Sequence, residues 1–119
     1  SKILLAKLGV VMKTFDPNYQ LLADMYRDDY FPPFLVDKIK VELNKLISLL
    51  ETGEQDVEVI QDKLDEIVIA INNLQEEFDE NESEIETVAR DSIGVTVEYI
   101  LKWFGIDIDN EEAIREREW

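Results

Sequence analysis

The feature that most constrains the fold is an apolar repeat in the second half of the chain. Between Val57 and Phe78, apolar residues recur at spacings that alternate between three and four, without a miss. Such a repeat places every member on one stripe of an α-helix, which suits packing against neighbouring helices at a shallow angle. It predicts a helix of about 25 residues that ends at Asn81. The members of this repeat are Val57, Ile60, Leu64, Ile67, Ile71, Leu74 and Phe78.

Two further long helices follow from the same kind of pattern. From Phe34 to Glu51 the apolar residues have helical spacing, and Thr52-Gly53 is typical of a helix C-terminus. Ser83-Glu84-Ile85-Glu86 matches a capping box, which predicts a helix from Glu84 to Phe104 with Ser83 as its N-cap. Its apolar face is wide, so this helix is expected either at the centre of a bundle or in a dimer.

Shorter helices are expected at the flanks. Asp16-Pro17 predicts the start of a helix that continues to Arg27, and Asp109 predicts the N-cap of a terminal helix. Leu4, Leu8, Val11 and Phe15 would suit an amphipathic helix in residues 1–15, which we interpret as an N-terminal extension. The sequence therefore predicts one all-α domain over residues 1–119. We expect an antiparallel helical bundle with three long helices and shorter flanking helices.

Charge restricts the partners. Residues 1–50 carry seven basic and six acidic side chains, whereas residues 51–119 carry five basic and 22 acidic ones. Such a field repels nucleic acids and anionic membranes, and it attracts basic proteins. We therefore expect no nucleic-acid partner and no membrane partner. Apolar runs are too short for a membrane span and cysteine is absent, so we expect a cytoplasmic protein.

The missing residue types exclude several chemistries. Without cysteine or histidine the chain cannot form disulfides, thiolate sites, His-activated serine nucleophiles or the Glu-x-x-His sites of di-iron bundles. Asp79-x-Asn81-x-Ser83 begins like a calcium-binding loop. It has Glu84 where the loop needs glycine and Arg90 where it needs a bidentate glutamate. We assign no metal and no cofactor.

One enzymatic alternative stays open. Glu76, Glu77 and Glu80 fit the Glu-Glu-x-x-Glu pattern of helical, magnesium-dependent nucleotide pyrophosphohydrolases, which this chain resembles in size and acidity. The second pattern of those enzymes, Glu-x-x-Asp on the next helix, is missing from the segment between Glu84 and Phe104. The alternative interpretation is a solvated acidic end of a helix.

Two segments are candidates for binding a partner. The first, Tyr26 to Phe34, contains four aromatic residues and two prolines. These rings could form a recognition turn for a partner, or they could pack into one end of the bundle as part of its core. We favour packing into the end of the bundle. The second is a carboxylate run from Glu76 to Glu86, which is either a solvated surface or a docking face for a basic protein. The candidate partner-binding residues are Tyr26, Asp28, Asp29, Tyr30, Phe31, Glu76, Glu77, Asp79 and Glu80.

The same two segments carry a resemblance to a known family. Met25-Tyr26-x-Asp28-x-Tyr30-Phe31-Pro32 and Leu74-Gln75-Glu76-Glu77-Phe78, together with Trp119, resemble a bacterial family of small acidic helical proteins classed as a domain of unknown function. The resemblance spans residues 18 to 119. It implies a bacterial cytoplasmic protein, and it supplies no activity and no catalytic residues.

The leading interpretation is a non-enzymatic module that binds a basic protein through its acidic surface, its aromatic turn, or both. The magnesium-dependent hydrolase is the first alternative. The second alternative is a homodimer, which an exposed patch along Ile93, Val97 and Ile100 would support.

Overall fold

The computed structural model describes residues 13–119, and within this range the regular elements are all helices. The all-α prediction is thus confirmed for the described residues. The helix expected around Leu4, Leu8 and Val11 lies outside them. The helices are α2 (Ala23–Tyr26), α3 (Pro33–Glu51), α4 (Val57–Asn72), α5 (Gln75–Glu80), α6 (Thr87–Trp103) and α7 (Asn110–Ala113).

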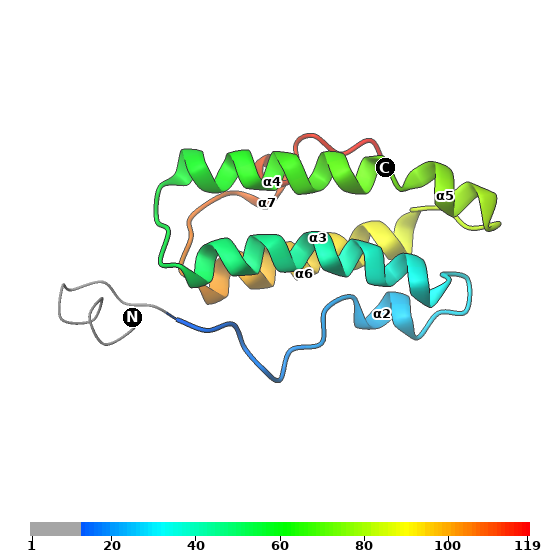
Figure 1. The fold of residues 1–119 in the computed structure, drawn as a ribbon, viewed down its shortest axis with the longest axis horizontal. Coiled ribbons are helices and arrows are strands. Elements are labelled where there is room, and N and C mark those ends of the chain that lie inside the picture. The colour runs from blue at the N-terminus through cyan, green and yellow to red at the C-terminus, as the bar shows by residue number, and fades with distance from the viewer. Residues whose placement is uncertain (1–12) are drawn as a thin grey trace.

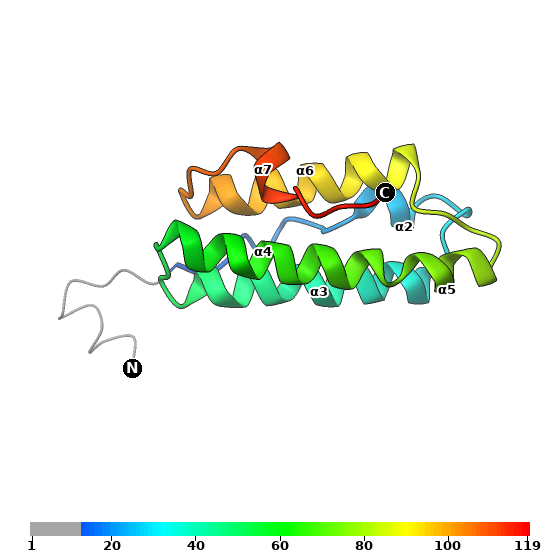
Figure 2. The ribbon, with the colours of Figure 1, turned by 90° about the horizontal axis from the view of Figure 1, so that it is seen from above.

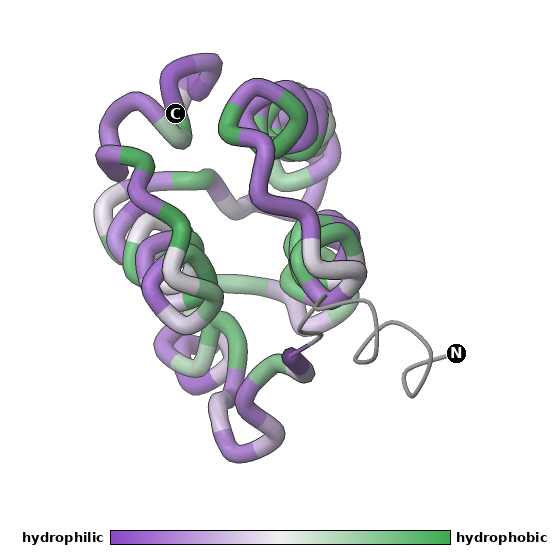
Figure 3. The backbone as a smooth tube through the Cα atoms, turned by 90° about the vertical axis from the view of Figure 1, so that its left-hand side faces the viewer, coloured by the Kyte–Doolittle hydropathy of each residue, from purple (hydrophilic) through white to green (hydrophobic). Residues whose placement is uncertain are grey.

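The helices lie in two layers. Helices α3 and α4 form a hairpin whose members run in opposite directions, and α5 continues from the end of α4 (Figure 1). Helix α6, with α2 and α7 packed on it, forms the second layer (Figure 2). Hydrophilic and hydrophobic residues alternate around the turns of the long helices, as expected for helices that bury one face (Figure 3). Buried residues from both layers form one continuous core.

The α4 seam is largely as predicted. Ile60, Leu64, Ile67 and Ile71 are fully buried. Val57 is wrong as a core residue: it lies in the first turn of α4 and its side chain is 49% exposed.

The single long helix expected from Val57 to Asn81 is interrupted. Asn73 and Leu74 form a turn, in which the Leu74 amide donates to the carbonyl of Ile71 at 3.0 Å. The Gln75 side chain donates to the carbonyl of Asn72 at 3.3 Å. Asparagine favours caps and turns over helix interiors, so the Asn72-Asn73 pair is a physical reason for the break. The apolar spacing survives the turn, because Phe78 on α5 is again fully buried.

The capping box predicted at Ser83 is wrong. Helix α6 begins at Thr87, and Ser83 instead closes α5. The Ser83 amide donates to the carbonyl of Phe78 at 2.9 Å and the Glu82 amide donates to that of Asp79 at 3.1 Å. Together with the φ of 59° at Glu82, this pattern is a Schellman motif.

Helix termini elsewhere follow the sequence more closely. Gly105, with a φ of 70°, closes α6, and Gly53, with a φ of 91°, follows α3, both as predicted. Asp109 caps α7 by accepting from the Glu111 amide at 3.2 Å. Of the helix expected from Pro17 to Arg27, only the last part forms, as α2. Asp16 instead accepts from the Asn18 amide across a turn, and α2 begins only at Ala23.

The homodimer alternative loses its proposed surface. Ile93, Val97 and Ile100 are fully buried in the core of one chain. The wide apolar face of α6 is explained by its position between α2, α7 and the hairpin (Figure 2). In the described part of the chain, no helix combines the length and the apolar character that crossing a lipid bilayer requires.

Polar contacts attach the C-terminal segment to α4. Gln61 donates to the carbonyl of Glu112 at 3.0 Å. Asn72 makes two bonds, donating to the carbonyl of Glu116 at 2.8 Å and accepting from the Glu118 amide at 3.0 Å. Arg115 binds Asp65 with two nitrogens, at 3.1 and 2.6 Å. The C-terminal segment is thus held on α4 by specific hydrogen bonds as well as by apolar packing.

The Asp65–Arg115 pair predicts an acid-dependent contribution to stability. Burial raises the pKa of Asp65, but hydrogen bonds from Arg115 and Gln61 outweigh it and lower the pKa below its usual value. The pair should therefore stabilise the fold above about pH 4 and lose this effect as the pH falls through the lowered pKa. We expect Asp65→Asn to destabilise the protein at pH 7 and to destabilise it less as the pH is lowered from 4 to 2, as measured by urea unfolding.

Asp62→Asn is the matched control, because Asp62 is an exposed carboxylate on the same helix. Its effect on stability at pH 7 should be small. An Asp65→Asn penalty that persists undiminished at pH 2 would show that the charge of Asp65 is not responsible.

Candidate functional site

The two segments singled out in the sequence lie at the same end of the molecule. The turn between α2 and α3 and the connection between α5 and α6 both lie at the right-hand end in Figure 1. We call residues 28–34 and 76–86 together the acidic–aromatic end. The long α3–α4 hairpin positions it, because α3 starts there and α5 extends there from α4.

The aromatic turn is shaped by its own polar residues. The Asp28 side chain accepts from the Tyr30 amide at 2.9 Å, and the Asp28 carbonyl accepts from the Phe31 amide at 3.1 Å. Asp28 therefore builds the turn, whereas Asp29 is exposed to solvent. Pro33 provides the first residue of α3, where a missing N–H is tolerated.

The aromatic rings of this turn have different roles. Phe31 is buried in the core, as expected if it plugs the end of the bundle. Tyr26 is half-buried, and its hydroxyl donates to Asp37 at 2.5 Å. Tyr30 and Phe34 are the outward rings, with 39% and 48% of their surface exposed. Only these two could contact a partner without a rearrangement of the core.

Tyr30 joins the two segments. Partial burial, with the neighbouring carboxylates of Glu86 and Glu84, raises the pKa of the Tyr30 phenol above its ordinary value. An exposed aromatic ring thus lies in the negative field of the carboxylate run. The run has seven acidic residues between Glu76 and Glu86 and no basic one.

Two cations on α2 and α3 are already engaged. Lys38 on α3 contacts both carboxylate oxygens of Glu77, at 2.8 and 2.7 Å. Arg27 pairs with Asp24 at 2.5 Å. Glu76, Asp79 and Glu80 are exposed and form no ion pair with any residue in the range 13–119. This end therefore presents uncompensated negative charge to solvent.

The carboxylates of the magnesium alternative do not converge. Glu76 and Glu80 are exposed, while Glu77 faces Lys38. Over residues 13–119, no three side chains of the metal-ligating types come close enough to share an ion. The described residues thus lack the geometry on which that alternative depends.

Two clefts lie elsewhere on the molecule, and neither was predicted from the sequence. One, of about 470 Å³, lies between α4 and α7 beside the exposed Val57 and the half-buried Ile108. Its other walls are mostly acidic. The acidic residues lining this α4–α7 cleft are Glu58, Asp62, Asp107, Asp109 and Glu112.

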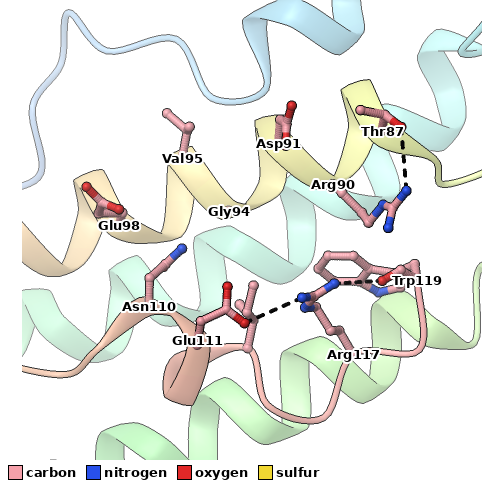
Figure 4. Close-up of a pocket in the computed structure, with 11 residues that line it drawn as sticks. Thr87, Arg90, Asp91, Gly94, Val95, Glu98, Asn110, Glu111, Arg117 and Trp119 are labelled. Carbon is pink, nitrogen blue, oxygen red and sulfur yellow. Dashed lines mark hydrogen bonds and ion pairs between the residues drawn. The ribbon is translucent and has the colours of Figure 1, made fainter.

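The other cleft, of about 580 Å³, lies between α6 and the C-terminal segment (Figure 4). Arg90 reaches into it from α6, and Arg117 and Trp119 line its opposite wall. We call it the α6–α7 cleft. These residues are separated in sequence and form no motif, so only the folded chain brings them together.

Comparison with known proteins identifies a family but no activity. Residues 15–119 match the model of a family described as a family of unknown function (DUF5713). The predicted resemblance to a domain of unknown function is thus confirmed over this range. The chain matches no curated protein and no solved structure.

Proposed function

The chain belongs to this family of unknown function, and we propose that it is a protein-interaction module that binds a basic protein segment at its acidic–aromatic end. The observation that carries the proposal is the position of Tyr30. Its ring is exposed, and the pKa of its phenol is raised by partial burial and by the charges of Glu86 and Glu84, so it lies in their electrostatic field. This surface thus combines an exposed aromatic side chain with a negative electrostatic field.

The chemistry of this surface favours a partner with both positive charge and apolar side chains. The carboxylates between Glu76 and Glu86 would accelerate encounter with a basic surface and select against acidic ones. Charge alone gives little affinity at physiological salt, because exposed ion pairs contribute only about 0–1 kcal/mol each. Tyr30 and Phe34 would supply the contact area, since aromatic residues are frequent hot spots in interfaces.

The test compares two synthetic peptides of equal positive charge. One is an amphipathic peptide of lysine and leucine, and the other contains lysine without apolar residues. We expect the amphipathic peptide to bind roughly tenfold more tightly, which corresponds to about 1.4 kcal/mol. Calorimetry gives the affinities, and amide NMR shifts should map the contact to residues 28–34 and 76–86.

Matched variants separate the aromatic contribution from charge. Tyr30→Ser with Phe34→Ser should abolish the preference for the amphipathic peptide while leaving the lysine peptide unaffected. Val59→Ser with Ile69→Ser is the control, because both are exposed apolar residues on α4, outside the proposed site. Equal binding of both peptides by the native protein, or shifts centred on the α4–α7 cleft, would refute the proposed site.

A further inference from the structure

The α6–α7 cleft has an excess of hydrogen-bond donors at one end. Figure 4 shows Arg90 from α6 and Arg117 from the C-terminal segment both reaching toward the indole of Trp119. Thr87, one turn before Arg90, adds a hydroxyl. A protein with a net charge of -16 has few cations, and two of them are placed at this end.

The neighbours of Arg90 leave it largely unsatisfied, whereas Arg117 is partly satisfied and also lies 5.8 Å from the centre of the Trp119 ring. Arg90 forms no ion pair with any residue from 13 to 119, and its only polar contact there is a long one of 3.5 Å to Thr87. Arg117 donates to the Trp119 carbonyl at 2.9 Å but reaches the Glu111 carboxylate only at 3.5 Å. Two like charges on one cleft disfavour each other, and an anion between them would remove that cost.

Two buried polar atoms of lining residues also lack partners. They are Nε1 of Trp119, a donor, and Oδ1 of Asn110, an acceptor. Trp119 as a whole is only 8% exposed. Buried polar atoms are paired in the great majority of cases, so two in one cleft indicate hydrogen-bonding capacity that residues 13–119 do not use.

Two of the three carboxylates that line the cleft lie away from the donor end, and the third, Glu111, pairs with Arg117 there. Glu98 is paired with Lys102 at 2.8 Å, and Figure 4 shows it at the far end of the cleft from Arg90. Asp91 points away from Arg117 and Trp119 in the same view. Glu111 pairs with Arg117 at 3.5 Å, so an anionic ligand would compete with this carboxylate for Arg117.

We propose that the α6–α7 cleft binds the oxyanion group of a small organic ligand, a carboxylate or a phosphate, between the guanidinium groups of Arg90 and Arg117. Guanidinium groups bind both groups with paired N–H donors. The indole of Trp119 and the side chain of Ile114 would contact the organic part. This inference is independent of the acidic–aromatic end and would stand if that proposal failed.

The indole N–H signals provide the test. The protein has two tryptophans, and Trp103 already donates to the Thr14 carbonyl at 2.9 Å, so its signal is an internal reference. Inorganic phosphate and acetate are titrated separately at pH 7, with chloride at matched ionic strength. We expect phosphate or acetate to move the Trp119 signal saturably while the Trp103 signal stays in place.

Variants tie the effect to the cleft. Arg90→Gln should weaken binding at least fivefold, and so should Arg117→Gln. Arg27→Gln is the control, because Arg27 is exposed and lies on the α2 side of the molecule. The tighter of the two ions indicates the ligand's group. Shifts equal to those with chloride, or affinities unchanged in both Arg90→Gln and Arg117→Gln, would overturn the proposal.

Discussion

Replacing Phe78 with alanine is expected to lower the free energy of unfolding by about 3–5 kcal/mol. Phe78 is fully buried, and it is the one buried residue of α5. Its loss removes the only side chain that anchors this six-residue helix to the core, and it leaves a cavity behind. The measurement is urea unfolding followed by far-ultraviolet circular dichroism.

The same substitution should also disturb the acidic–aromatic end, because α5 carries Glu76 and Glu77. Glu80→Ala is the matched control: it lies on the same short helix, is exposed, and should change stability by less than about 0.5 kcal/mol. A loss below about 1 kcal/mol for Phe78→Ala would mean that α5 is not docked as described.

Leu64→Ala is expected to cost about 2–5 kcal/mol, the range for removing a large aliphatic side chain from a core. Leu64 is fully buried in the middle of α4, where both layers of the bundle meet. Val57→Ala tests a residue that the sequence repeat predicts to be buried but that the structure shows to be exposed. Val57 belongs to the same sequence repeat but is exposed, so we expect a change of less than about 0.5 kcal/mol.

Denaturation of Leu64→Ala and Val57→Ala under identical conditions tests whether burial follows the sequence repeat or the described structure. If the repeat alone determined burial, both substitutions would be costly. Similar losses at Leu64 and Val57 would therefore contradict the described start of α4. A loss below 1 kcal/mol at Leu64 would contradict the register of the whole helix.

The long helices were predictable because apolar periodicity is a direct consequence of burying one helical face. The seam from Ile60 to Ile71 and the extent of α3 follow from it. The break after Asn72 could not be predicted from the periodicity, because the turn at Asn73 and Leu74 leaves the spacing to Phe78 undisturbed. A periodicity records which residues face the core, and it does not record every hydrogen bond of the backbone.

The misplaced cap at Ser83 has a specific cause. The Schellman motif that closes α5 places Glu82 in the left-handed region, where glycine is usual. Without a glycine the sequence gives no sign of this motif, whereas Ser83 and Glu86 match the capping-box pattern. Gly105, in the same role at the end of α6, was predicted because its residue type reveals the conformation.

In the candidate sites, too, the sequence reveals the residue types, whereas only the fold reveals their burial and their distant neighbours. Aromatic residues between Tyr26 and Phe34 are visible in the sequence, but which rings are buried depends on α3 and the core. The charges of Glu84 and Glu86 act on Tyr30, more than 50 positions away in the sequence, so only the fold establishes this interaction. The pairing of Arg90 with the wall formed by Arg117 and Trp119 is equally non-local.

The attachment of the C-terminal segment has a consequence for motion. Asn72 and Gln61 hold this segment to α4 through bonds to its backbone, and Ala113, Ile114 and Trp119 add buried contacts. Because these contacts act together, we expect the segment to open as one unit and not residue by residue. Detachment would carry Arg117 away from Arg90 and divide the α6–α7 cleft into two separate surfaces. Any ligand that spans the cleft would therefore slow amide hydrogen exchange in residues 110–119.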